Sequence, residues 1–381
     1  MKIVYCLNSI RYLGGIQRVT IVKANALAEI DGNEVYIVVS DNKAGSQVAK
    51  LSDKVHLIDL DINYYDGDVN LSKLSNIIVY SIQRKKHRKE LQRFLTDLKP
   101  DVVISVGGNE KYMILSMKNR TWKVVREFHF ERNYRQMHSK TKFDHVVASC
   151  LDYYDFHFKE KKYDRIVLLT QEDKELNWPG WNNVDVIPNP VSFNCQEPSD
   201  LTEKTVVYAG RLDPVKNCCS LVNSFKIVAE RHPDWALKIY GEGSEKELIQ
   251  NRILELGLQD NVFLMGFSKD IMTAYKQSSI SVLSSLSEGF ALVIVEAMEC
   301  GVPVVSYQCP FGPEDLITEG QDGFLVPVGD EQKMADRICE LIEDDQLRSR
   351  MGIAAKEKAK QYHLDKIVER WMQFFNELRN N

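Results

Sequence analysis

The sequence predicts an α/β protein built from two Rossmann-like domains with parallel sheets. Short β-branched runs alternate with helical segments along the chain, which is typical of parallel strands covered by helices on both faces. The alternation starts again near residue 205, where a strand-like run leads into a glycine turn as it does near the N-terminus. With 381 residues, the chain also exceeds one ordinary core of roughly 100–200 residues.

The expected strands are short runs rich in Val and Ile. In the first half they are Lys2–Leu7, Glu34–Val39, Val55–Leu60, Val102–Val106, Lys123–Phe128 and Ile166–Leu169. In the second half they are Thr205–Ala209, Ala236–Tyr240, Val262–Met265, Ile280–Ser284, Val302–Ser306 and Phe324–Val326. Residues that directly follow these strands are therefore the ones to examine for function.

Helical periodicity lies between these strands. From Ile16 to Ile30 apolar residues follow i, i+3 and i+4 spacing, with Lys23 interrupting the stripe and Gly32 as the expected C′ residue. Residues 244–247, Ser-Glu-Lys-Glu, are interpreted as a capping box that opens a helix ending near residue 256. A last helix is expected from about residue 363 to 378.

Two prolines separate the halves. The run Ile187-Pro188-Asn189-Pro190 fixes φ and withholds backbone donors, so we expect a first domain at 1–187, a linker at 188–195 and a second domain at 196–362. The net charge is −5, but residues 1–190 hold 29 basic and 24 acidic side chains and the remainder 20 and 30, giving +5 and −10. This asymmetry raises the question of an anionic partner for the basic half.

Several classes of protein are excluded or disfavoured by composition. No run approaches about 18 apolar residues, and Met1-Lys2 leads straight into a strand without a secretion signal, so we expect a cytoplasmic protein. Eight cysteines without CxxC spacing favour buried thiols over disulfides or zinc. Neither half shows GxGxxG after its first strand, so a nicotinamide dehydrogenase loses its main support.

Two cations follow the first strand of the second half. Gly210 ends the strand, and Arg211 and Lys216 flank a turn before a helix. Arginine offers a planar fork to phosphate oxygens and lysine a flexible point charge, so the pair could neutralise a diphosphate without a metal. The alternative is two solvated surface cations.

A second glycine turn follows the strand Ile280–Ser284. Glu288-Gly289 turns the chain, and a helix is expected to start near Phe290 and stop at Gly301. Free N–H groups at residues 290–292 and the helix dipole would form an anion site. Glu296 stands among apolar residues about two turns along, where a ribose diol would be a suitable partner for its carboxylate. The alternative is an ordinary helix with one exposed glutamate.

These stretches together carry a family resemblance. Gly210-Arg211-Leu212 with Lys216, and then Glu288-Gly289-Phe290 with Glu296-Ala297-Met298, resemble the motifs of glycosyltransferase family 4. Supporting stretches extend over nearly the whole chain at 14–19, 300–305 and 323–327, and Cys309-Pro310-Phe311-Gly312-Pro313 resembles a variant of bacterial members that build surface polysaccharides. The resemblance implies the GT-B fold, two Rossmann-like domains facing across a cleft, with residues 363–381 returning to the first domain.

The resemblance also implies roles for individual residues. Arg211 and Lys216 would hold the donor diphosphate, Glu296 the ribose, and Glu288 the sugar near its 3-hydroxyl. Gly266-Phe267 match the place where family members hold the nucleotide base, and Gly15 would approach the phosphates from the other domain. The implied donor-binding residues are Gly14, Gly15, Gly210, Arg211, Lys216, Gly266, Phe267, Glu288, Gly289, Phe290, Ala291, Leu292 and Glu296, and the implied catalytic residues are Arg211, Lys216, Glu288 and His129.

The function implied is transfer of a sugar with retention from a nucleotide sugar, UDP-linked by family frequency, to a glycan or lipid-linked glycan in polysaccharide biosynthesis, such as that of capsule or lipopolysaccharide. The donor is a substrate, so no cofactor and no metal are expected. Asp66-Gly67-Asp68 imitates a metal motif but is interpreted as turn chemistry. The two glutamates could also suggest a retaining glycosidase, but that function would not use the cations Arg211 and Lys216, so it is disfavoured. A sugar-nucleotide epimerase and a non-catalytic nucleotide-sugar-binding scaffold remain as alternatives.

One basic run stands apart from these motifs. A helical projection places the cations Arg84, Lys85, Lys86, Arg88, Lys89 and Arg93 away from an apolar side formed by Leu91, Phe94, Leu95 and Leu98. The run is either a solvated helix face or a surface for anionic lipid headgroups, which would place the protein peripherally on the inner face of the membrane. Nucleic acid is disfavoured because no aromatic residues interleave the cations.

Overall fold

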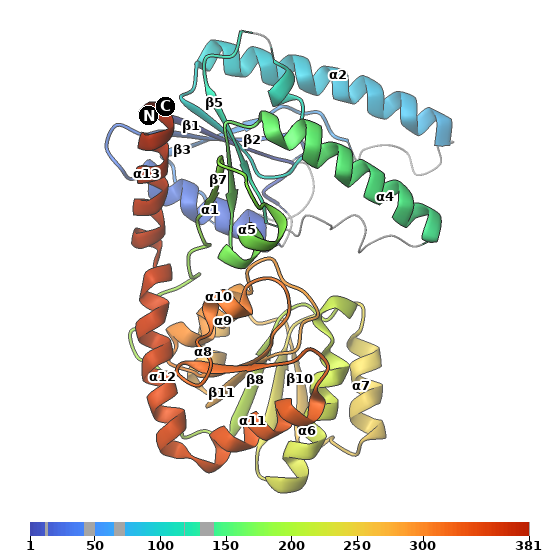
Figure 1. Ribbon diagram of the computed structural model, residues 1–381, viewed down its shortest axis with the longest axis vertical. Helices are drawn as coiled ribbons and strands as arrows, with labels where there is room; N and C mark the ends of the chain where they lie inside the picture. The colour runs from blue at the N-terminus through green and yellow to red at the C-terminus, as the bar shows by residue number, and fades with distance from the viewer. Residues whose placement is uncertain (12–13, 42–49, 65–72, 118, 130–140, 381) are drawn as a thin grey trace. The chain divides into compact units, whose positions relative to one another are not determined.

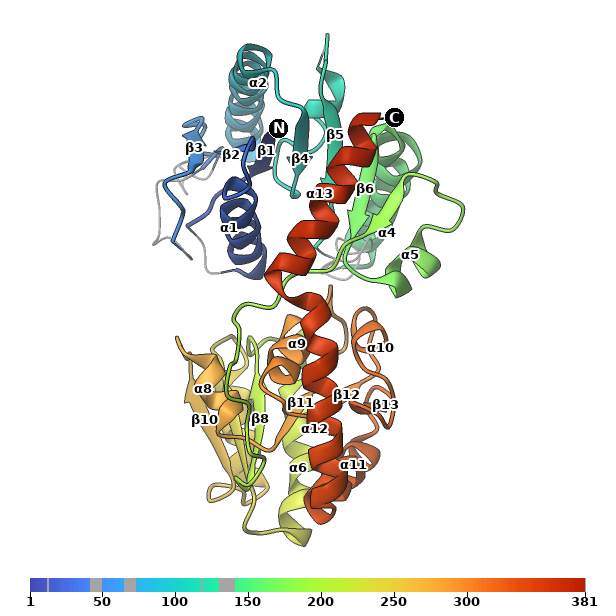
Figure 2. The ribbon, with the colours of Figure 1, turned by 90° about the vertical axis from the view of Figure 1, so that its left-hand side faces the viewer.

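The computed structural model describes residues 1–11, 14–41, 50–64, 73–117, 119–129 and 141–380, which form two compact units. The first unit comprises Met1–Leu169, Leu176–Pro190 and Leu364–Asn381, and the second Thr170–Glu175 and Val191–His363. The main division therefore falls after Pro190, and the last helix belongs to the first unit. Figures 1 and 2 label the helices and strands of both units.

In the described part of the first unit, a seven-stranded parallel sheet has the order β3-β2-β1-β4-β5-β6-β7. Its strands are β1 (Lys2–Leu7), β2 (Glu34–Val39), β3 (Val55–Asp59), β4 (Val102–Ser105), β5 (Lys123–Glu127), β6 (Arg165–Leu168) and β7 (Val184–Val186). The helices are α1 (Gly15–Ala28), α2 (Lys73–Leu98), α4 (Lys142–Tyr154) and α13 (Leu364–Asn380), while α5 (Gln171–Asn177) starts in the second unit and ends in the first.

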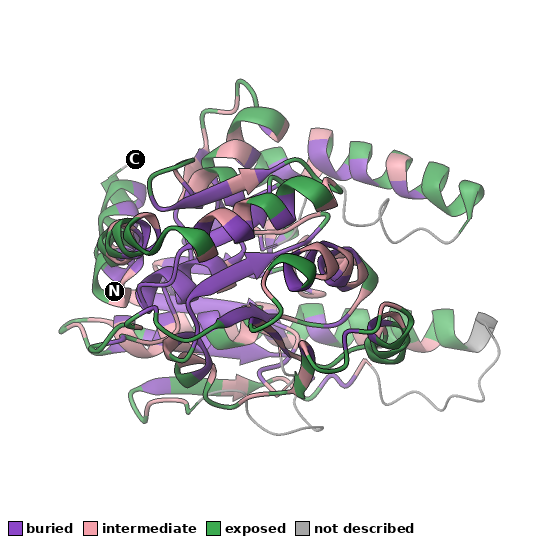
Figure 3. Ribbon diagram, turned by 90° about the horizontal axis from the view of Figure 1, so that it is seen from below, coloured by how far each residue is buried: buried purple, intermediate pink, exposed green. Residues whose placement is uncertain are grey.

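The faces of this sheet follow from the alternation of side chains along its strands. Ile3 and Tyr5 of β1 pack with α1 and α13, whereas Val4 and Cys6 pack on the opposite face with α2. Both faces are therefore covered, and most strand residues are buried, as the colours of Figure 3 show. This is the arrangement expected for parallel strands.

In the second unit, a six-stranded parallel sheet has the order β10-β9-β8-β11-β12-β13. Its strands are β8 (Thr205–Ala209), β9 (Ala236–Tyr240), β10 (Val262–Gly266), β11 (Ile280–Leu283), β12 (Val304–Tyr307) and β13 (Gly323–Val326). Its helices are α6 (Cys218–Arg231), α7 (Lys246–Glu255), α8 (Ile271–Lys276), α9 (Leu292–Glu299), α10 (Pro313–Leu316), α11 (Glu331–Glu343) and α12 (Asp345–Ala359). The predicted fold of two Rossmann-like parallel sheets is confirmed.

The element predictions need a few corrections. Each predicted strand is present with its ends within two residues, but β7 was not predicted because it has three residues with an aspartate in the middle. Helix α1 ends at Ala28, so Gly32, although its φ is +82°, lies in the following turn and is not the C′ residue. The capping box at 244–247 is wrong, because α7 begins at Lys246 after Glu245 without a side-chain cap.

Lys23 lies in the apolar stripe of α1 because it has a buried partner. Its ammonium group pairs with the carboxylate of Glu127 at the end of β5, and both side chains are almost completely buried. The Trp371 ring of α13 lies over the ammonium group, with 4.7 Å between the nitrogen and the ring centroid. The pair therefore ties α1, β5 and α13 together inside the first unit.

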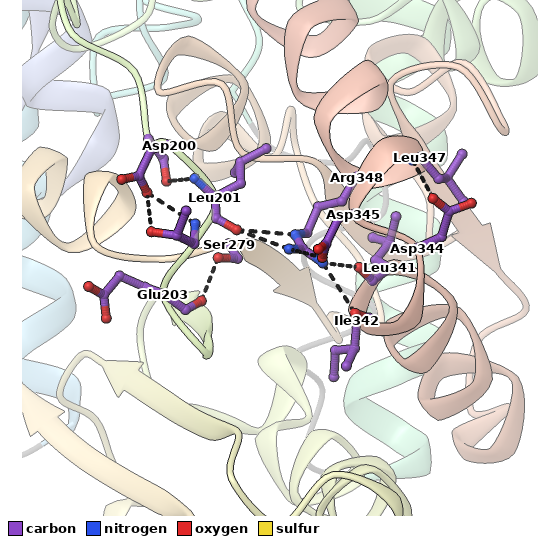
Figure 4. Close-up of polar contacts among 12 residues, drawn as sticks. Asp200, Leu201, Glu203, Ser279, Leu341, Ile342, Asp344, Asp345, Leu347 and Arg348 are labelled. Carbon is purple, nitrogen blue, oxygen red and sulfur yellow. Dashed lines mark hydrogen bonds and ion pairs between the residues drawn. The ribbon is translucent and has the colours of Figure 1, made fainter.

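Arg348 makes a similar connection within the second unit (Figure 4). It is buried on α12, and its guanidinium group donates to the carbonyl oxygens of Leu341 at 2.5 Å and Leu201 at 3.1 Å. Asp344 caps α12 by accepting a hydrogen bond from the Leu347 N–H at 2.8 Å. These bonds fix the corner between α11 and α12 against the segment that leads into β8.

The eight cysteines are free thiols, as expected, but they are not all buried. Cys150 is exposed on α4, and Cys219 is partly exposed on α6. Across the described residues, no helix combines the length and apolar character needed to span a membrane.

We predict that Lys23→Met lowers the free energy of unfolding by about 3–5 kcal/mol, because it leaves the Glu127 carboxylate buried without its cation. The control is Lys54→Met. The Lys54–Glu29 pair, at 2.6 Å, is more than half exposed, so its loss should cost less than about 1 kcal/mol. Urea-unfolding midpoints of both variants measure the difference, and equal small shifts would contradict the structural role of the buried pair.

Candidate functional site

The loop after β8 is held in place by the loop after β9. The Leu212 N–H donates to the carbonyl oxygen of Glu242 at 3.0 Å, and the Glu245 N–H donates to that of Leu212 at 2.8 Å. Leu212 is buried, whereas the side chain of Arg211 is 75% exposed and lies 3.1 Å from Asp213. The loop thus anchors its apolar residue and presents its arginine at the carboxyl end of the sheet.

Two glycines that the sequence analysis did not single out allow this close approach. A Cβ at Gly241, where φ is +155°, would lie 1.8 Å from the carbonyl oxygen of Gly210. A Cβ at Gly243 would lie 2.2 Å from the carbonyl oxygen of Leu212. The signal available in the sequence was a Gly-Glu-Gly run directly after a predicted strand.

Lys216 and Glu288, predicted separately, form an ion pair. The Lys216 ammonium group lies 2.5 Å from Glu288 Oε1, and their side chains are 17% and 9% exposed. The Ser285 hydroxyl donates to the same carboxylate oxygen at 2.6 Å, and the Leu286 N–H donates to the carbonyl oxygen of Val215 at 2.8 Å. The loops after the neighbouring strands β8 and β11 therefore form one polar cluster.

Helix α9 begins later than expected, at Leu292. Ala291 is the N-cap and has the left-handed conformation, with φ of +62°. The prediction that the helix starts near Phe290, with its first free N–H groups at residues 290–292, is therefore wrong, because the helix starts at Leu292. Phe290 is buried and packs edge-on against Tyr362, with 5.9 Å between ring centroids. Glu296 consequently lies about one turn into α9, not two, and it is buried, so the exposed-glutamate alternative is wrong.

The loop of residues 309–313 supports the Glu288 turn. The Glu288 N–H donates to the carbonyl oxygen of Pro310 at 2.6 Å, and the Phe311 N–H donates back to that of Glu288 at 3.1 Å. A Cβ at Gly312, where φ is +120°, would lie 2.4 Å from the carbonyl oxygen of Phe290. In the sequence this stretch carries only a family resemblance, whereas in the structure it supports the turn at Glu288-Gly289.

Glu172 contacts the same loop from the segment 170–175. Burial, together with Glu314 and Asp315, raises the pKa of Glu172 to about 7, although a hydrogen bond from the Gly312 N–H lowers it. Three carboxylates therefore meet at the short helix α10, next to the loop that braces Glu288.

Gly266 and Phe267 close β10 at the same edge of the sheet. Gly266 has a φ of +74°, and its carbonyl oxygen accepts a hydrogen bond from the Gly241 N–H at 2.9 Å. The Phe267 ring is 61% exposed. An aromatic ring thus lies open to solvent at the carboxyl end of the sheet, and the assignment of Gly266 and Phe267 to the nucleotide base stays a prediction.

In the first unit, His129 follows β5 and is buried beside the Lys23–Glu127 pair. Its Nε2 lies 3.2 Å from Glu127 Oε1. Burial alone would raise the pKa of Glu127, but Lys23 and His129 outweigh it and hold this pKa at about 2. Gly14 is the N-cap of α1, and Gly15 is its first residue, where an added Cβ would meet nothing within 4 Å. The histidine was predicted from resemblance, but its charged neighbours were not.

Other predicted features have mixed outcomes. Asp66-Gly67-Asp68 lies outside the described residues. Leu91 and Leu95 of α2 are buried and the predicted cations are exposed, so the predicted orientation of this helix is confirmed. Among the described residues, His232, Cys339 and Glu343 could together hold a metal ion, but Arg231 lies 3.8 Å from Glu343 and supplies a competing positive charge.

Comparisons with known proteins find similarity to glycosyltransferases. Residues 194–358 match the family model "Glycosyl transferases group 1". An uncharacterized glycosyltransferase of Haemophilus influenzae is 29% identical over 380 residues, which cover 97% of this chain and 98% of that protein. A poly(ribitol-phosphate) alpha-N-acetylglucosaminyltransferase of Staphylococcus aureus is 30% identical over 218 residues, which cover 56% of this chain and 44% of that protein.

A solved structure shows the same fold. A mutant of S. aureus TarM in complex with Fondaparinux, alpha-GlcNAc-glycerol and UDP superposes with a TM-score of 0.76 at 17% identity, covering 98% of this chain and 99% of that one.

We predict that Glu172→Gln stabilises the protein near pH 8 and has little effect near pH 5. The folded-state pKa of about 7 exceeds the ordinary value of 4.5, so the native protein loses stability as pH rises through this window. Glutamine stays neutral and removes that loss. Melting temperatures between pH 5 and 8 test this, with the exposed residue Glu247→Gln as control; parallel profiles for all three proteins would refute it.

Proposed function

We propose that this chain is a GT-B glycosyltransferase that transfers a sugar with retention from a UDP-sugar to a glycan or lipid-linked glycan in polysaccharide biosynthesis. The match of residues 194–358 to the glycosyl transferases group 1 model and the shared fold support this proposal. The observation that carries the proposal is the Lys216–Glu288 ion pair, 2.5 Å long, at the carboxyl edge of the second sheet. A poly(ribitol-phosphate) alpha-N-acetylglucosaminyltransferase and a poly(glycerol-phosphate) alpha-glucosyltransferase among the relatives support the polysaccharide assignment.

We assign the donor diphosphate to Arg211 and Lys216. Arg211 is exposed at the end of β8, and Lys216 is nearly buried five residues later. A diphosphate placed between them would meet a planar donor fork and a point charge. It would also draw Lys216 away from Glu288, which leaves the glutamate free to accept hydrogen bonds from sugar hydroxyls.

We assign the ribose and the base of the donor to residues at the same carboxyl edge of the second sheet. Glu296 is assigned to the ribose, because a buried carboxylate there is well matched to a pair of hydroxyl donors. The base is assigned to Gly266 and the exposed ring of Phe267. Gly210 and the stretch Gly289-Phe290-Ala291-Leu292 complete the proposed donor site. His129, Gly14 and Gly15 of the first unit are proposed from family resemblance alone.

The reaction we propose needs charge stabilisation at the leaving group. Departure of the nucleoside diphosphate develops negative charge on phosphate oxygens, which Arg211, Lys216 and the start of α9 would stabilise. The acceptor hydroxyl would attack the oxocarbenium-like carbon from the face that the diphosphate leaves, which retains configuration. The departing phosphate would accept the hydroxyl proton, so no cofactor, metal or separate base takes part in this proposal.

Membrane association is a further part of the proposal. The cations Arg84, Lys85, Lys86, Arg88, Lys89 and Arg93 of α2 are all exposed. Each exposed cation near an anionic bilayer contributes about 1 kcal/mol. We therefore propose a peripheral enzyme on the cytoplasmic face of the membrane.

Arg211→Ala is expected to lower the rate of sugar transfer about a hundredfold, because a donor to the developing phosphate charge contributes about 3 kcal/mol. The matched control is Arg350→Ala, an exposed arginine of α12 that should leave the rate unchanged. A panel of nucleotide sugars identifies the donor by thermal shift, and NMR of the product reports its anomeric configuration. A folded Arg211→Ala protein with full activity would sink the diphosphate assignment, and an inverted product would exclude retention.

The double variant Lys85→Glu/Lys89→Glu should lose co-flotation with vesicles that contain anionic lipid. The control, Lys54→Glu/Lys366→Glu, changes the net charge equally at exposed sites outside α2. Flotation that does not depend on anionic lipid, or that both variants reduce alike, would remove the assignment to α2.

A further inference from the structure

The first unit contains a cavity of about 250 Å³ at the carboxyl end of β4. It is enclosed by α2, by the loop after β4 and by the last turns of α4 with the residues that follow. Its polar lining residues are Arg84, Asn109, Lys111, Asp155 and Lys159. Tyr80, Tyr112 and Leu151 supply the aromatic and apolar part of the wall. None of these residues belongs to the donor site proposed above.

The polar lining of the cavity has an excess of positive charge. Three cations, Arg84, Lys111 and Lys159, face one carboxylate, Asp155, which lies 2.8 Å from Lys159. The Tyr112 ring lies beneath both lysines, with 4.7 Å and 4.3 Å from their nitrogens to its centroid. This lining is complementary in charge to an anion such as phosphate.

The ring itself is fixed by a buried acid. The Tyr112 hydroxyl donates to Glu160 Oε1 at 2.9 Å, and Glu160 is only 5% exposed. Burial, Glu160 and Asp155 all raise the pKa of Tyr112, so the hydroxyl keeps its proton and the bond is maintained. The ring under the two lysines is therefore anchored through its hydroxyl group.

An exposed apolar stripe leads away from this cavity along α4. Phe143, Val147, Leu151 and Tyr154 recur at helical spacing on one face, and all are exposed, Phe143 by 76%. The facing α2 exposes Ile77, Ile78, Tyr80 and Ile82. Tyr80 and Leu151 belong both to these exposed sets and to the cavity wall. So many exposed large apolar side chains on two neighbouring helices indicate an interaction surface.

We propose that the cavity binds the phosphate of an amphiphilic acceptor whose apolar chain lies along α4. Charge complementarity favours this occupant. The cations lie at one end of the apolar stripe, so a phosphate group would contact the cations while the hydrocarbon chain joined to it contacts the stripe. A second copy of this chain or a free anion would use only one of these two features. The inference rests on the proposed function and narrows its acceptor to one carrying a phosphate and a lipid.

Isothermal titration of the full chain with farnesyl phosphate, inorganic phosphate and farnesol tests this proposal. Farnesyl phosphate should bind at least tenfold more tightly than either of the others, because only it uses both features. Arg84→Ala should weaken its binding about tenfold or more, since a hydrogen bond to a charged group is lost. Lys162→Ala, an exposed lysine after α4 that does not line the cavity, should bind normally. Leu151→Ser should weaken the binding of farnesyl phosphate but leave the binding of inorganic phosphate unchanged.

The other results would overturn the inference. These are equal affinity for inorganic phosphate, equal affinity for farnesol, absence of binding, or the same loss in Lys162→Ala as in Arg84→Ala. UDP titrated into the same proteins separates this failure from failure of the proposed function. If UDP binds and farnesyl phosphate does not, the acceptor inference alone is wrong. If UDP does not bind, the donor assignment fails independently.

Discussion

The ion pair between Lys216 and Glu288 is the interaction on which the candidate donor site depends. It joins loops that follow β8 and β11, two strands that are neighbours in the sheet although some seventy residues apart in the sequence. Because both groups are nearly buried, each compensates the charge of the other until a ligand supplies a replacement. Gly241 and Gly243 allow the loop after β9 to approach residues 210–212 closely, and Gly312 allows the same for Phe290.

The first unit also contains a buried ion pair, formed by Lys23 and Glu127. Lys23 and Glu127 carry charge into the apolar interface between α1, α13 and the sheet, and the Trp371 ring covers the ammonium group. The acid also lies against His129 at the end of β5. A positioned acid beside this histidine would control its orientation, which gives physical content to a residue otherwise singled out by resemblance.

Most of the fold followed from the sequence because strand alternation and glycine turns are local signals. Arg211 and Glu288 could be placed at strand ends for the same reason. The partners of charged residues could not be predicted, since Lys23 with Glu127 and Lys216 with Glu288 are brought together only by tertiary packing. The starts of two helices were also predicted wrongly. Ala291 adopts a positive φ, which is unusual for alanine and could not be predicted from its residue type. The N-cap of α7 is Glu245 and not Ser244, the residue that the capping-box pattern predicted.

The last helix has a consequence for the order in which the protein is made. Helix α13 (Leu364–Asn380) belongs to the first unit although the whole second unit precedes it in the chain. On the ribosome, the strands of the first sheet are synthesised long before Trp371, so α1 and one apolar face of the sheet stay uncovered until α13 is made. The first unit therefore begins to form first during synthesis but is completed last. Its exposed apolar face during that interval is a surface that a chaperone would cover.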